Sequence, residues 1–362
     1  MLGPANQETL MRARADLRLG IPVVLAGTKN EAIIAPIEVL SQKRLDQLKL
    51  IDKNSFILIT ERRAQTLKCS IYDRSFARIE LAQVAKITSL KAIADPSLDL
   101  RNPLKGPFNI IRDKTLELEN EAILLLKSSQ LLPAAVVSQI VDGKNYASDH
   151  NLTYLKTDQL LEMAMSPRGI SDAISAEVPT ARAESSQFHI FRPNISGEEH
   201  YAVEIGKIDR NKPTLVRIHS ACFTGDVLGS LKCDCGPQLH AATKMIDDQG
   251  GGLLIYLNQE GRGIGIANKI RAYSLQDQGF DTVEANHRLG FEDDERDFQL
   301  GAAILKGMRI TNIKLITNNP SKISTMSSYG INVVERIPLK VGQTKNNLRY
   351  LKTKARKSGH LM

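Results

Sequence analysis

Aromatic side chains are scarce in this sequence of 362 residues. It contains no tryptophan, and the aromatic residues together make up 5% of the chain. Proteins that bind single-stranded nucleic acid rely on aromatic rings that stack on the bases. The shortage of rings therefore disfavours nucleic acid as a partner, although the formal net charge of +8 taken alone favours one.

Long apolar runs are absent as well. No stretch approaches the roughly 20 apolar residues that span a bilayer, and the N-terminus lacks the charged-then-apolar pattern of a signal peptide. We therefore expect no membrane partner and a cytoplasmic location. Hydrophobic residues at 42% and charged residues at 24% are typical of a globular protein, which excludes a collagenous, coiled-coil or wholly disordered chain.

The positive charge is concentrated at one end of the chain. From position 340 to the C-terminus there are seven cations and no acid: Lys340, Lys345, Arg349, Lys352, Lys354, Arg356 and Lys357. Subtracting these seven from +8 leaves +1 for the other 339 residues. The charge therefore marks a basic tail that can help to draw in an anionic ligand. Because the chain has few rings for base stacking, we expect no nucleic-acid partner.

The length suits two domains, each with its own core. In the first half, Ile21–Leu25 reads as a buried strand, and Glu119–Leu132 reads as a helix stopped by the proline that follows. The stretch from Ser166 to Ser186, rich in Ser, Ala, Pro and Gly, reads as the linker region. We divide the chain into residues 1–174 and 175–362 and predict two α/β domains.

The second half alternates between strand-like and helix-like segments. The predicted strands are Thr214–Ile218, Leu253–Leu257, Ile313–Thr317 and Ile331–Ile337, and the predicted helices are Pro237–Asp248, Ile264–Gln278, Arg296–Lys306 and Ser321–Tyr329. Proline opens the first of these helices, and glycine follows the ends of the other three. In such a fold, ligand-binding groups lie at the carboxyl ends of the strands.

Three of the four cysteines, Cys222, Cys233 and Cys235, fall within fourteen residues. In a cytoplasmic chain this clustering indicates a metal or a reactive thiol before a disulfide. Zinc favours thiolate ligands, and three protein ligands leave a fourth position for a water whose pKa falls toward ~7. His219 could instead close a structural site, and reduced cysteines that fill core space are the other alternative. The fourth cysteine, Cys69, reads as an idle thiol.

Two segments join a strand to a helix with groups suited to an anion. In Gln259–Gly265, backbone N–H groups and a helix N-terminus can face an anion, and Arg262 offers a bidentate phosphate partner. The spacing fits neither a P-loop nor a dinucleotide fingerprint, and an ordinary glycine-rich turn explains it equally well. In Thr317–Lys322, the lysine falls in the first helical turn, although Asn-Pro is also a common turn.

The segment Phe291–Phe298 surrounds Arg296 with five acids. Acids are favoured at a helix N-terminus by the macrodipole and stay solvated there. The functional alternative uses one carboxylate as a base and Arg296 against a phosphate. With the cysteines and the two turns, the residues alone predict a zinc hydrolase that acts on a phosphorylated ligand.

These motifs together resemble GTP cyclohydrolase II. They run in unbroken order from about Val178 to Met362, as VRIHSACFTGD, LKCDCGPQL, NQEGRGIG, NKIRAYSLQDQGFDTVEANHRLGF, DDERDFQLGA, LITNNPSKI and GINVVERIPL. The resemblance implies that GTP is hydrolysed to 2,5-diamino-6-ribosylamino-4(3H)-pyrimidinone 5′-phosphate, formate and pyrophosphate, the first step of riboflavin synthesis. It also implies a catalytic Zn²⁺ in each subunit, Mg²⁺ on the GTP triphosphate, and a homodimer.

The resemblance assigns roles position by position. Cys222, Cys233 and Cys235 match the zinc ligands. The positions that match contacts to GTP are Arg217, Ile218, His219, Ser220, Ala221, Gln238, Glu260, Gly261, Arg262, Thr282, Thr317 and Lys322. Asp294 matches the proton acceptor, Arg296 the nucleophile toward the α-phosphate, and Tyr273 the tyrosine linked to completing the ring chemistry.

Two of these assignments leave an alternative open. A guanidinium has no free lone pair at neutral pH, so Arg296 is better suited to stabilise charge as pyrophosphate leaves. The family commonly has Glu where this chain has Ala221, which removes a side-chain contact to GTP but preserves a backbone contact.

The first half resembles, more faintly, 3,4-dihydroxy-2-butanone-4-phosphate synthase, in the runs RADLRLGIPVVL and EAILLLKSSQLLPAAVV. The synthase's acidic loop is replaced by AGTKNEA, whose one acid is Glu31, and its catalytic HTEA reads ENEA from Glu119. The Glu of its ICE motif becomes Gln139. Because a Mg²⁺ site needs clustered carboxylates, we expect a non-catalytic domain that serves folding, dimerisation or regulation.

Two alternatives to the full reaction are a family variant that releases a formylated ring-opened product and a non-catalytic GTP-binding regulator. Tyr273 argues against the first. The intact cysteines, Asp294 and Arg296 argue against the second.

Overall fold

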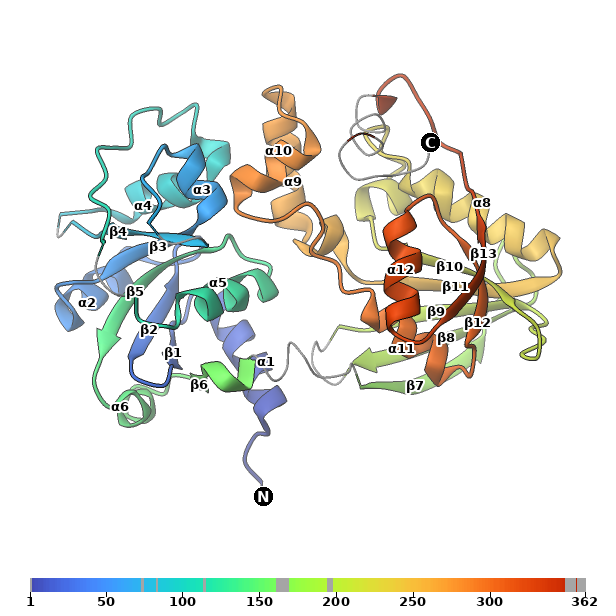
Figure 1. Ribbon diagram of the computed structural model, residues 1–362, viewed down its shortest axis with the longest axis horizontal. Helices are drawn as coiled ribbons and strands as arrows, with labels where there is room; N and C mark the ends of the chain where they lie inside the picture. Colours follow the sequence, from blue (N-terminus) through green and yellow to red (C-terminus); the bar gives the residue numbers. More distant parts are fainter. Residues whose placement is uncertain are drawn as a thin grey trace. The chain divides into compact units, whose positions relative to one another are not determined.

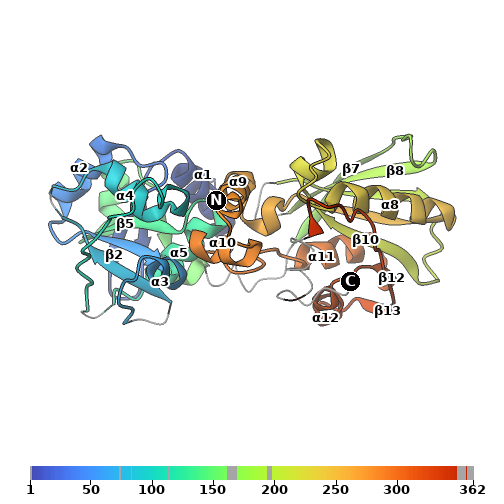
Figure 2. The ribbon, with the colours of Figure 1, turned by 90° about the horizontal axis from the view of Figure 1, so that it is seen from above.

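The computed structural model describes residues 2–72, 75–82, 84–112, 115–160, 169–193, 198–348 and 356. The chain forms two compact units (Figures 1 and 2). Unit 1 comprises Met1–Ser166 and Ala267–Asp294, and unit 2 comprises Pro167–Ile266 and Glu295–Met362. The α/β class is confirmed for both units, but each unit is built from two separate stretches of chain. The predicted division at residue 174 assumed that each domain is one uninterrupted stretch of chain, and it stays a prediction.

Unit 1 is built on a six-stranded sheet in the order β4-β3-β5-β2-β1-β6. Its strands are β1 (Val23–Ala26), β2 (Glu31–Pro36), β3 (Phe56–Thr60), β4 (Phe76–Glu80), β5 (Ala134–Ile140) and β6 (Tyr154–Lys156). All pairings are antiparallel except that of β1 with β6. The strand predicted at Ile21–Leu25 is confirmed as β1.

The helices of unit 1 come from both of its stretches. They are α1 (Asn6–Arg18), α2 (Gln42–Ile51), α3 (Glu61–Thr66), α4 (Ile87–Ala94), the short 3₁₀ turn η1 (Pro96–Leu98), α5 (Glu119–Ser128), α6 (Gly143–Asp149), α9 (Ile266–Asp277, its first residue in unit 2) and α10 (Thr282–Leu289). The predicted helix Glu119–Leu132 is confirmed as α5. It ends four residues early because the chain turns at Gln130, which has a positive φ. The predicted helix Ile264–Gln278 is confirmed as α9.

Helix α10 was not predicted from the sequence. It begins with a capping box in which Asp281 accepts the N–H of Glu284 and Glu284 accepts the N–H of Asp281. This Asp-x-x-Glu spacing is a recognised sign of a helix start and could have revealed the helix. The helix ends at Gly290, whose φ of +89° suits glycine.

Unit 2 is built on a seven-stranded mixed sheet in the order β13-β12-β10-β11-β9-β8-β7. The strands are β7 (Ile170–Glu177), β8 (Ser186–Pro193), β9 (His200–Gly206), β10 (Thr214–Ser220), β11 (Gly251–Leu257), β12 (Asn312–Ile316) and β13 (Asn332–Ile337). The four strands from β13 to β11 are parallel, and β9, β8 and β7 continue the sheet antiparallel. All four strands predicted in the second half are confirmed.

The linker expected at Ser166–Ser186 is wrong over its described part. Residues 170–177 form β7, which pairs antiparallel with β8. Seven of the eight residues of β7 are exposed at the edge of the sheet, so no apolar alternation marks the strand in the sequence. Residues 166–168 lie outside the described part of the chain.

Helices cover both faces of this sheet (Figure 2). Helix α8 (Cys235–Asp248) packs on one face through Ala242 and Ile246. Helices α11 (Gln299–Gly307) and α12 (Pro320–Ser328) pack on the other, where Ile304 and Met326 join the core beneath Val216. The helix predicted at Arg296–Lys306 is confirmed but begins three residues later, so Arg296 precedes it. Among the described residues, no helix is both long and apolar enough to cross a membrane.

Candidate functional site

The three predicted metal ligands lie together in unit 2. The sulfur atoms of Cys222, Cys233 and Cys235 are all within 4.8 Å of one another. Within the described parts of the chain, this is the group of three or more His, Cys, Asp or Glu side chains that could hold a metal ion. Cys222 follows β10, whereas the other two lie at the start of α8, so a strand end and a helix start converge on one point.

The backbone at Gly225 leaves room for the three thiols. This glycine lies in the short helical turn η2 (Phe223–Val227). A Cβ added at Gly225 would lie 2.7 Å from the sulfur of Cys233 and 2.9 Å from that of Cys222. Thiolates at such a spacing are the donor set that zinc prefers in proteins. The hydrogen bond to Cys222 and burial raise the pKa of the Cys233 thiol, so a bound metal has to displace its proton.

A buried carboxylate fixes the first of these cysteines. Asp226 accepts the backbone N–H of Cys222 at 3.0 Å, the hydroxyl of Tyr256 at 2.9 Å and Nε2 of His219 at 3.0 Å. The side chains of Asp226 and His219 are both 3% exposed. His219 is not part of the group of side chains that could hold a metal ion, so the alternative in which it completes the metal site is not supported. Burial lowers the pKa of His219 and raises that of Tyr256, so both side chains are neutral at pH 7.

A second buried network starts from Arg217 in β10. Its Nη1 donates to the carbonyl of Ile316 at 2.9 Å, and its Nη2 donates to Oε1 of Gln238 at 2.6 Å. The amide of Gln238 donates in turn to Asp234, which lies between Cys233 and Cys235 directly before α8. Burial lowers the pKa of Arg217 to about 10, so the guanidinium stays charged at neutral pH.

Buried polar atoms without hydrogen-bond partners gather at the carboxyl ends of β10 and β11. They are Nε of Arg217, Nδ1 of His219, Oγ of Ser220 and Oε1 of Gln259. Buried polar atoms in folded proteins nearly always have a partner. A bound ligand that offers both hydrogen-bond donors and acceptors could satisfy these atoms, so this edge of the sheet is suited to a polar ligand.

The glycine-rich turn is tied to the cysteine segment by Glu260. Its carboxylate accepts the N–H of Phe223, the residue after Cys222, and the N–H of Gly261. Gly261 and Arg262 both have positive φ in the short 3₁₀ turn η3 (Glu260–Gly263). A Cβ on Gly263 would lie 2.5 Å from the carbonyl oxygen of Glu295. The turn is therefore a strained, specific structure and not a generic glycine-rich connection.

Two cations share one aromatic ring near the start of α11. The guanidinium carbon of Arg296 lies 4.8 Å from the ring centre of Phe298, and Nζ of Lys322 lies 4.9 Å from it. Nζ of Lys322 also donates to the carbonyl of Ile218 at 2.9 Å. Both predicted phosphate partners are thus oriented by the same ring, which suits an anionic group.

The predicted site residues fall in both units. Those of unit 2 are Arg217, Ile218, His219, Ser220, Ala221, Cys222, Cys233, Cys235, Gln238, Glu260, Gly261, Arg262, Arg296, Thr317 and Lys322. Tyr273, Thr282 and Asp294 belong to unit 1. Nζ of Lys269 lies 5.8 Å from the ring centre of Tyr273, and Oγ1 of Thr282 accepts from Gln276 at 3.3 Å.

Sequence reasoning missed Asp226, Tyr256 and Asn319. Asp226 stands inside the quoted FTGD run, between the first and second cysteine, which is the one signal that could have singled it out. Asn319 accepts the N–H of Ser321 and so caps α12, one turn before Lys322. Each of these residues orients a predicted site residue and is not itself a predicted ligand.

Comparisons with known proteins agree on one family. A family model described as GTP cyclohydrolase II matches residues 171–338. A protein named GTP cyclohydrolase-2 from Azospirillum brasilense is 36% identical over 366 residues, which is 99% of this chain and 94% of the relative. A GTP cyclohydrolase-2 from Neisseria meningitidis is 58% identical over 167 residues, 46% of this chain and 85% of the relative. The riboflavin biosynthesis protein RibBA of Phocaeicola vulgatus is 35% identical over 91% of this chain and 85% of its own.

Proposed function

The chain belongs to the GTP cyclohydrolase II family of hydrolases, and we propose that it converts GTP to formate, pyrophosphate and 2,5-diamino-6-ribosylamino-4(3H)-pyrimidinone 5′-phosphate as the first step of riboflavin synthesis. The observation that best supports the proposal is the group of three thiols for which the glycine at position 225 leaves room. A homodimer in the cytoplasm is part of the same proposal.

Cys222, Cys233 and Cys235 would hold Zn²⁺, a Lewis acid that makes hydroxide available at neutral pH for opening the imidazole ring of GTP. The protein's own part is to keep the three thiols at this spacing. Asp226 does so for Cys222 through its backbone N–H, α8 does so for Cys235, which is its first residue, and the amide of Asn347 binds the carbonyl of Cys233. With three protein ligands, one coordination position would remain for water or substrate, as catalytic zinc sites require.

The partnerless atoms of Arg217, His219, Ser220 and Gln259 would receive the polar groups of GTP. Nδ1 of His219 is an acceptor, because Nε2 carries the proton that is donated to Asp226. Nε of Arg217 is a donor. An acceptor beside a donor matches a purine ring that carries both.

Arg262, Arg296 and Lys322 would bind the triphosphate, with Mg²⁺ on its β- and γ-oxygens. A guanidinium offers no free lone pair for attack, so the role proposed for Arg296 is to stabilise negative charge as pyrophosphate leaves. Asp294 as proton acceptor, Thr282 as a GTP contact and Tyr273 in completing the ring chemistry follow the family assignment.

Residues 1–160 are proposed to lack synthase activity. The carboxylate of Glu31 is bound to the N–H of Gly143 and the hydroxyl of Tyr154. That of Glu119 accepts the N–H groups of Leu116 and Leu118. These acids therefore satisfy local backbone and side-chain donors, and no carboxylate cluster suited to Mg²⁺ occurs among the described residues of unit 1.

The deciding experiment incubates the full-length protein, loaded with zinc, with GTP and Mg²⁺. We expect formate and pyrophosphate in equal amounts, and we expect Cys233→Ser to abolish formate release while the chain stays folded. Mass spectrometry of the nucleotide product separates the alternatives. A formylated product would identify a family variant, and tight GTP binding without turnover would identify a regulator.

A further inference from the structure

Residues 267–294 fold with the N-terminal half of the chain. They belong to unit 1 although they lie inside the stretch that matches the family model. Helix α10 packs against α3 in this unit. The segment also carries Tyr273, Thr282 and Asp294, three residues with proposed roles in the reaction. How firmly the N-terminal half holds this segment therefore bears on the chemistry.

The main attachment is Arg271 in α9. Its Nε donates to Oδ2 of Asp95 at 3.0 Å, and its Nη2 donates to Oε1 of Glu38 at 2.9 Å. Its Nη1 donates to Oδ1 of Asn268, one helical turn earlier, at 2.8 Å. The three charged side chains are mostly buried, with exposed fractions of 21% for Arg271, 13% for Glu38 and 15% for Asp95. Because the guanidinium is planar and its three acceptors lie on three different residues, these hydrogen bonds hold Arg271 in one orientation.

Both carboxylates also accept hydrogen bonds from groups within the N-terminal half. The second oxygen of Glu38 accepts the N–H of Leu132 at 2.7 Å. The second oxygen of Asp95 accepts the N–H and the hydroxyl of Ser97 at the start of η1. The N-terminal half therefore presents a preformed acceptor pair, so little side-chain freedom remains to be lost when Arg271 binds it.

The same side of α9 makes a further hydrogen bond to the N-terminal half. The side chain of Asn268 is fully buried and donates to the carbonyl of Gln130 at 3.0 Å. Gln130 has a positive φ in the turn after α5. Arg271 and Asn268 thus form one continuous contact along one face of α9.

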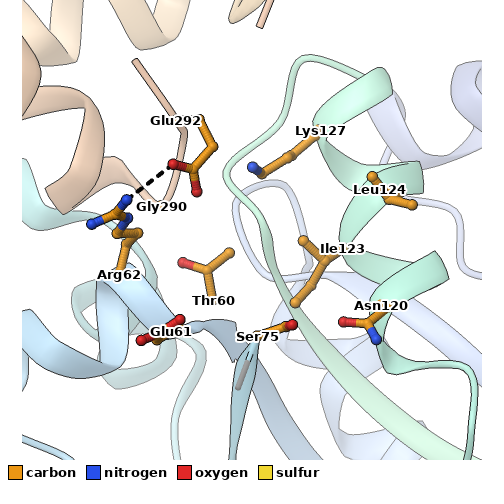
Figure 3. Close-up of a pocket in the computed structure, with 10 residues that line it drawn as sticks. All are labelled: Thr60, Glu61, Arg62, Ser75, Asn120, Ile123, Leu124, Lys127, Gly290 and Glu292. Atoms are coloured by element: carbon orange, nitrogen blue, oxygen red, sulfur yellow. Dashed lines mark hydrogen bonds and ion pairs between the residues drawn. The ribbon is translucent and has the colours of Figure 1, made fainter. Parts of the chain in front are cut away.

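The other end of the segment is fitted to the N-terminal half by shape. A Cβ on Gly290 would lie 2.6 Å from Oγ1 of Thr60 and 2.8 Å from Cγ of Pro133. The next side chain, Phe291, is 1% exposed. Beyond it, Glu292 forms an exposed ion pair with Arg62 at 3.1 Å, at the rim of a pocket of about 430 Å³ (Figure 3). The segment is therefore held at both ends, by hydrogen bonds at Arg271 and by close packing at Gly290.

We propose that residues 1–160 serve the cyclohydrolase as a scaffold for residues 267–294, and that Arg271 is the positioning residue that fixes this segment. The inference rests on the proposed function. This scaffold role for the N-terminal half requires none of the carboxylates of a synthase active site.

Arg271 acts on the reaction through Tyr273. The two residues are two positions apart on α9, and Lys269, two positions before Arg271, places its ammonium over the ring of Tyr273. Release of Arg271 frees this part of α9 to shift, which moves the tyrosine without altering the cysteines of unit 2. The expected signature is a fall in kcat with the metal content unchanged.

The test uses the full-length protein and two independent measurements on Arg271→Ala. Hydrogen exchange followed by mass spectrometry should show at least tenfold faster exchange in peptides of α9 and α10, with α8 unchanged. Formate release should show kcat reduced at least tenfold at unchanged zinc content. The matched control is Arg62→Ala, which removes an arginine from the exposed pair with Glu292 and should change neither measurement.

Conservative variants keep the test informative. Arg271→Lys preserves the charge but cannot donate to three acceptors in one plane. It should regain less than half of the kcat that Arg271→Ala loses. Glu38→Gln preserves the shape of the acceptor and should give the same pattern as Arg271→Ala in milder form, which covers the case in which Arg271→Ala does not fold. Unchanged kcat in a variant whose α9 exchanges faster would overturn the proposal while leaving the cyclohydrolase activity established. Absence of formate release in the parent protein would instead overturn the proposed function, and the exchange data would still report on the scaffold.

Discussion

The carboxylate of Asp226 lies 3.0 Å from the backbone nitrogen of Cys222 and accepts its hydrogen. The same carboxylate receives Nε2 of His219 and the hydroxyl of Tyr256. One buried acid thus fixes the backbone of Cys222, a proposed metal ligand, and the tautomer of His219, a proposed contact to GTP. Groups in this second layer commonly decide how tightly a metal is bound.

Replacing Asp226 with Asn should weaken zinc binding without removing a ligand. The amide keeps one acceptor for the N–H of Cys222 but loses the charge that attracts His219 and Tyr256. We expect zinc affinity to fall by about 10- to 100-fold, measured by competition with a chromogenic chelator. Asp248→Asn, which alters an exposed pair with Lys244 at the far end of α8, is the control and should leave the affinity unchanged. Equal affinities for Asp226→Asn and the parent protein would contradict the assigned role.

A methyl group at Gly225 should exclude the metal. The added carbon would lie 2.7 Å from the sulfur of Cys233 and 2.9 Å from that of Cys222, well inside van der Waals contact. We expect Gly225→Ala to be recovered with less than a tenth of the zinc of the parent protein, as measured by elemental analysis, and without formate release. Gly307→Ala adds the same methyl group where the nearest atom is 3.9 Å away and should retain full zinc content. A fully loaded Gly225→Ala protein would show that the thiols do not converge on this point.

The role of Arg296 can be decided between a nucleophile and a stabiliser of charge. A nucleophilic arginine would leave a phosphorus–nitrogen adduct that raises the mass of the protein during turnover, whereas a stabilising cation would not. We expect no mass increase in protein quenched during turnover. We also expect Arg296→Lys to retain more activity than Arg296→Ala, because a positive charge remains over the ring of Phe298. Removing one such stabilising group costs about 10²- to 10³-fold in kcat. An adduct in the parent protein would reverse this assignment.

Much of unit 2 could be predicted because the patterns that mark its strands and helices each lie within a short stretch of sequence. Buried parallel strands such as β10 and β11 read as short apolar runs, and glycine or proline marks the helix ends. The grouping of the three cysteines could be predicted in the same way, because separations of eleven and two residues allow a strand end and a helix start to meet at one point. Strand β7 escaped because an exposed edge strand carries no apolar alternation.

What the sequence could not reveal depends on residues far apart in the chain. The bond between Arg271 and Glu38 joins positions 233 residues apart, and no local pattern in α9 indicates that its partner lies near the N-terminus. The role of Asp226 likewise depends on Tyr256, which reaches it from the neighbouring strand β11. Long-range pairs of this kind are set by packing, and a single sequence does not record them.

The stability of unit 2 should fall on acidification because of His200, the first residue of β9. Its Nδ1 accepts the N–H of Asn258 at 3.0 Å, its side chain is 1% exposed, and burial lowers its pKa to about 4. The unfolded chain, with an ordinary histidine pKa near 6.5, binds a proton more readily, so stability is present above pH 6.5 and is lost as the pH falls toward 4. The difference corresponds to about 3 kcal/mol at most.

In chelator-treated protein, the urea midpoint should therefore drop between pH 7 and 4.5, and His200→Asn, whose amide oxygen still accepts from Asn258, should show a smaller drop. His150→Asn, at an exposed position of unit 1, should behave as the parent protein does. Equal drops for the parent protein and His200→Asn would show that other groups govern the acid sensitivity.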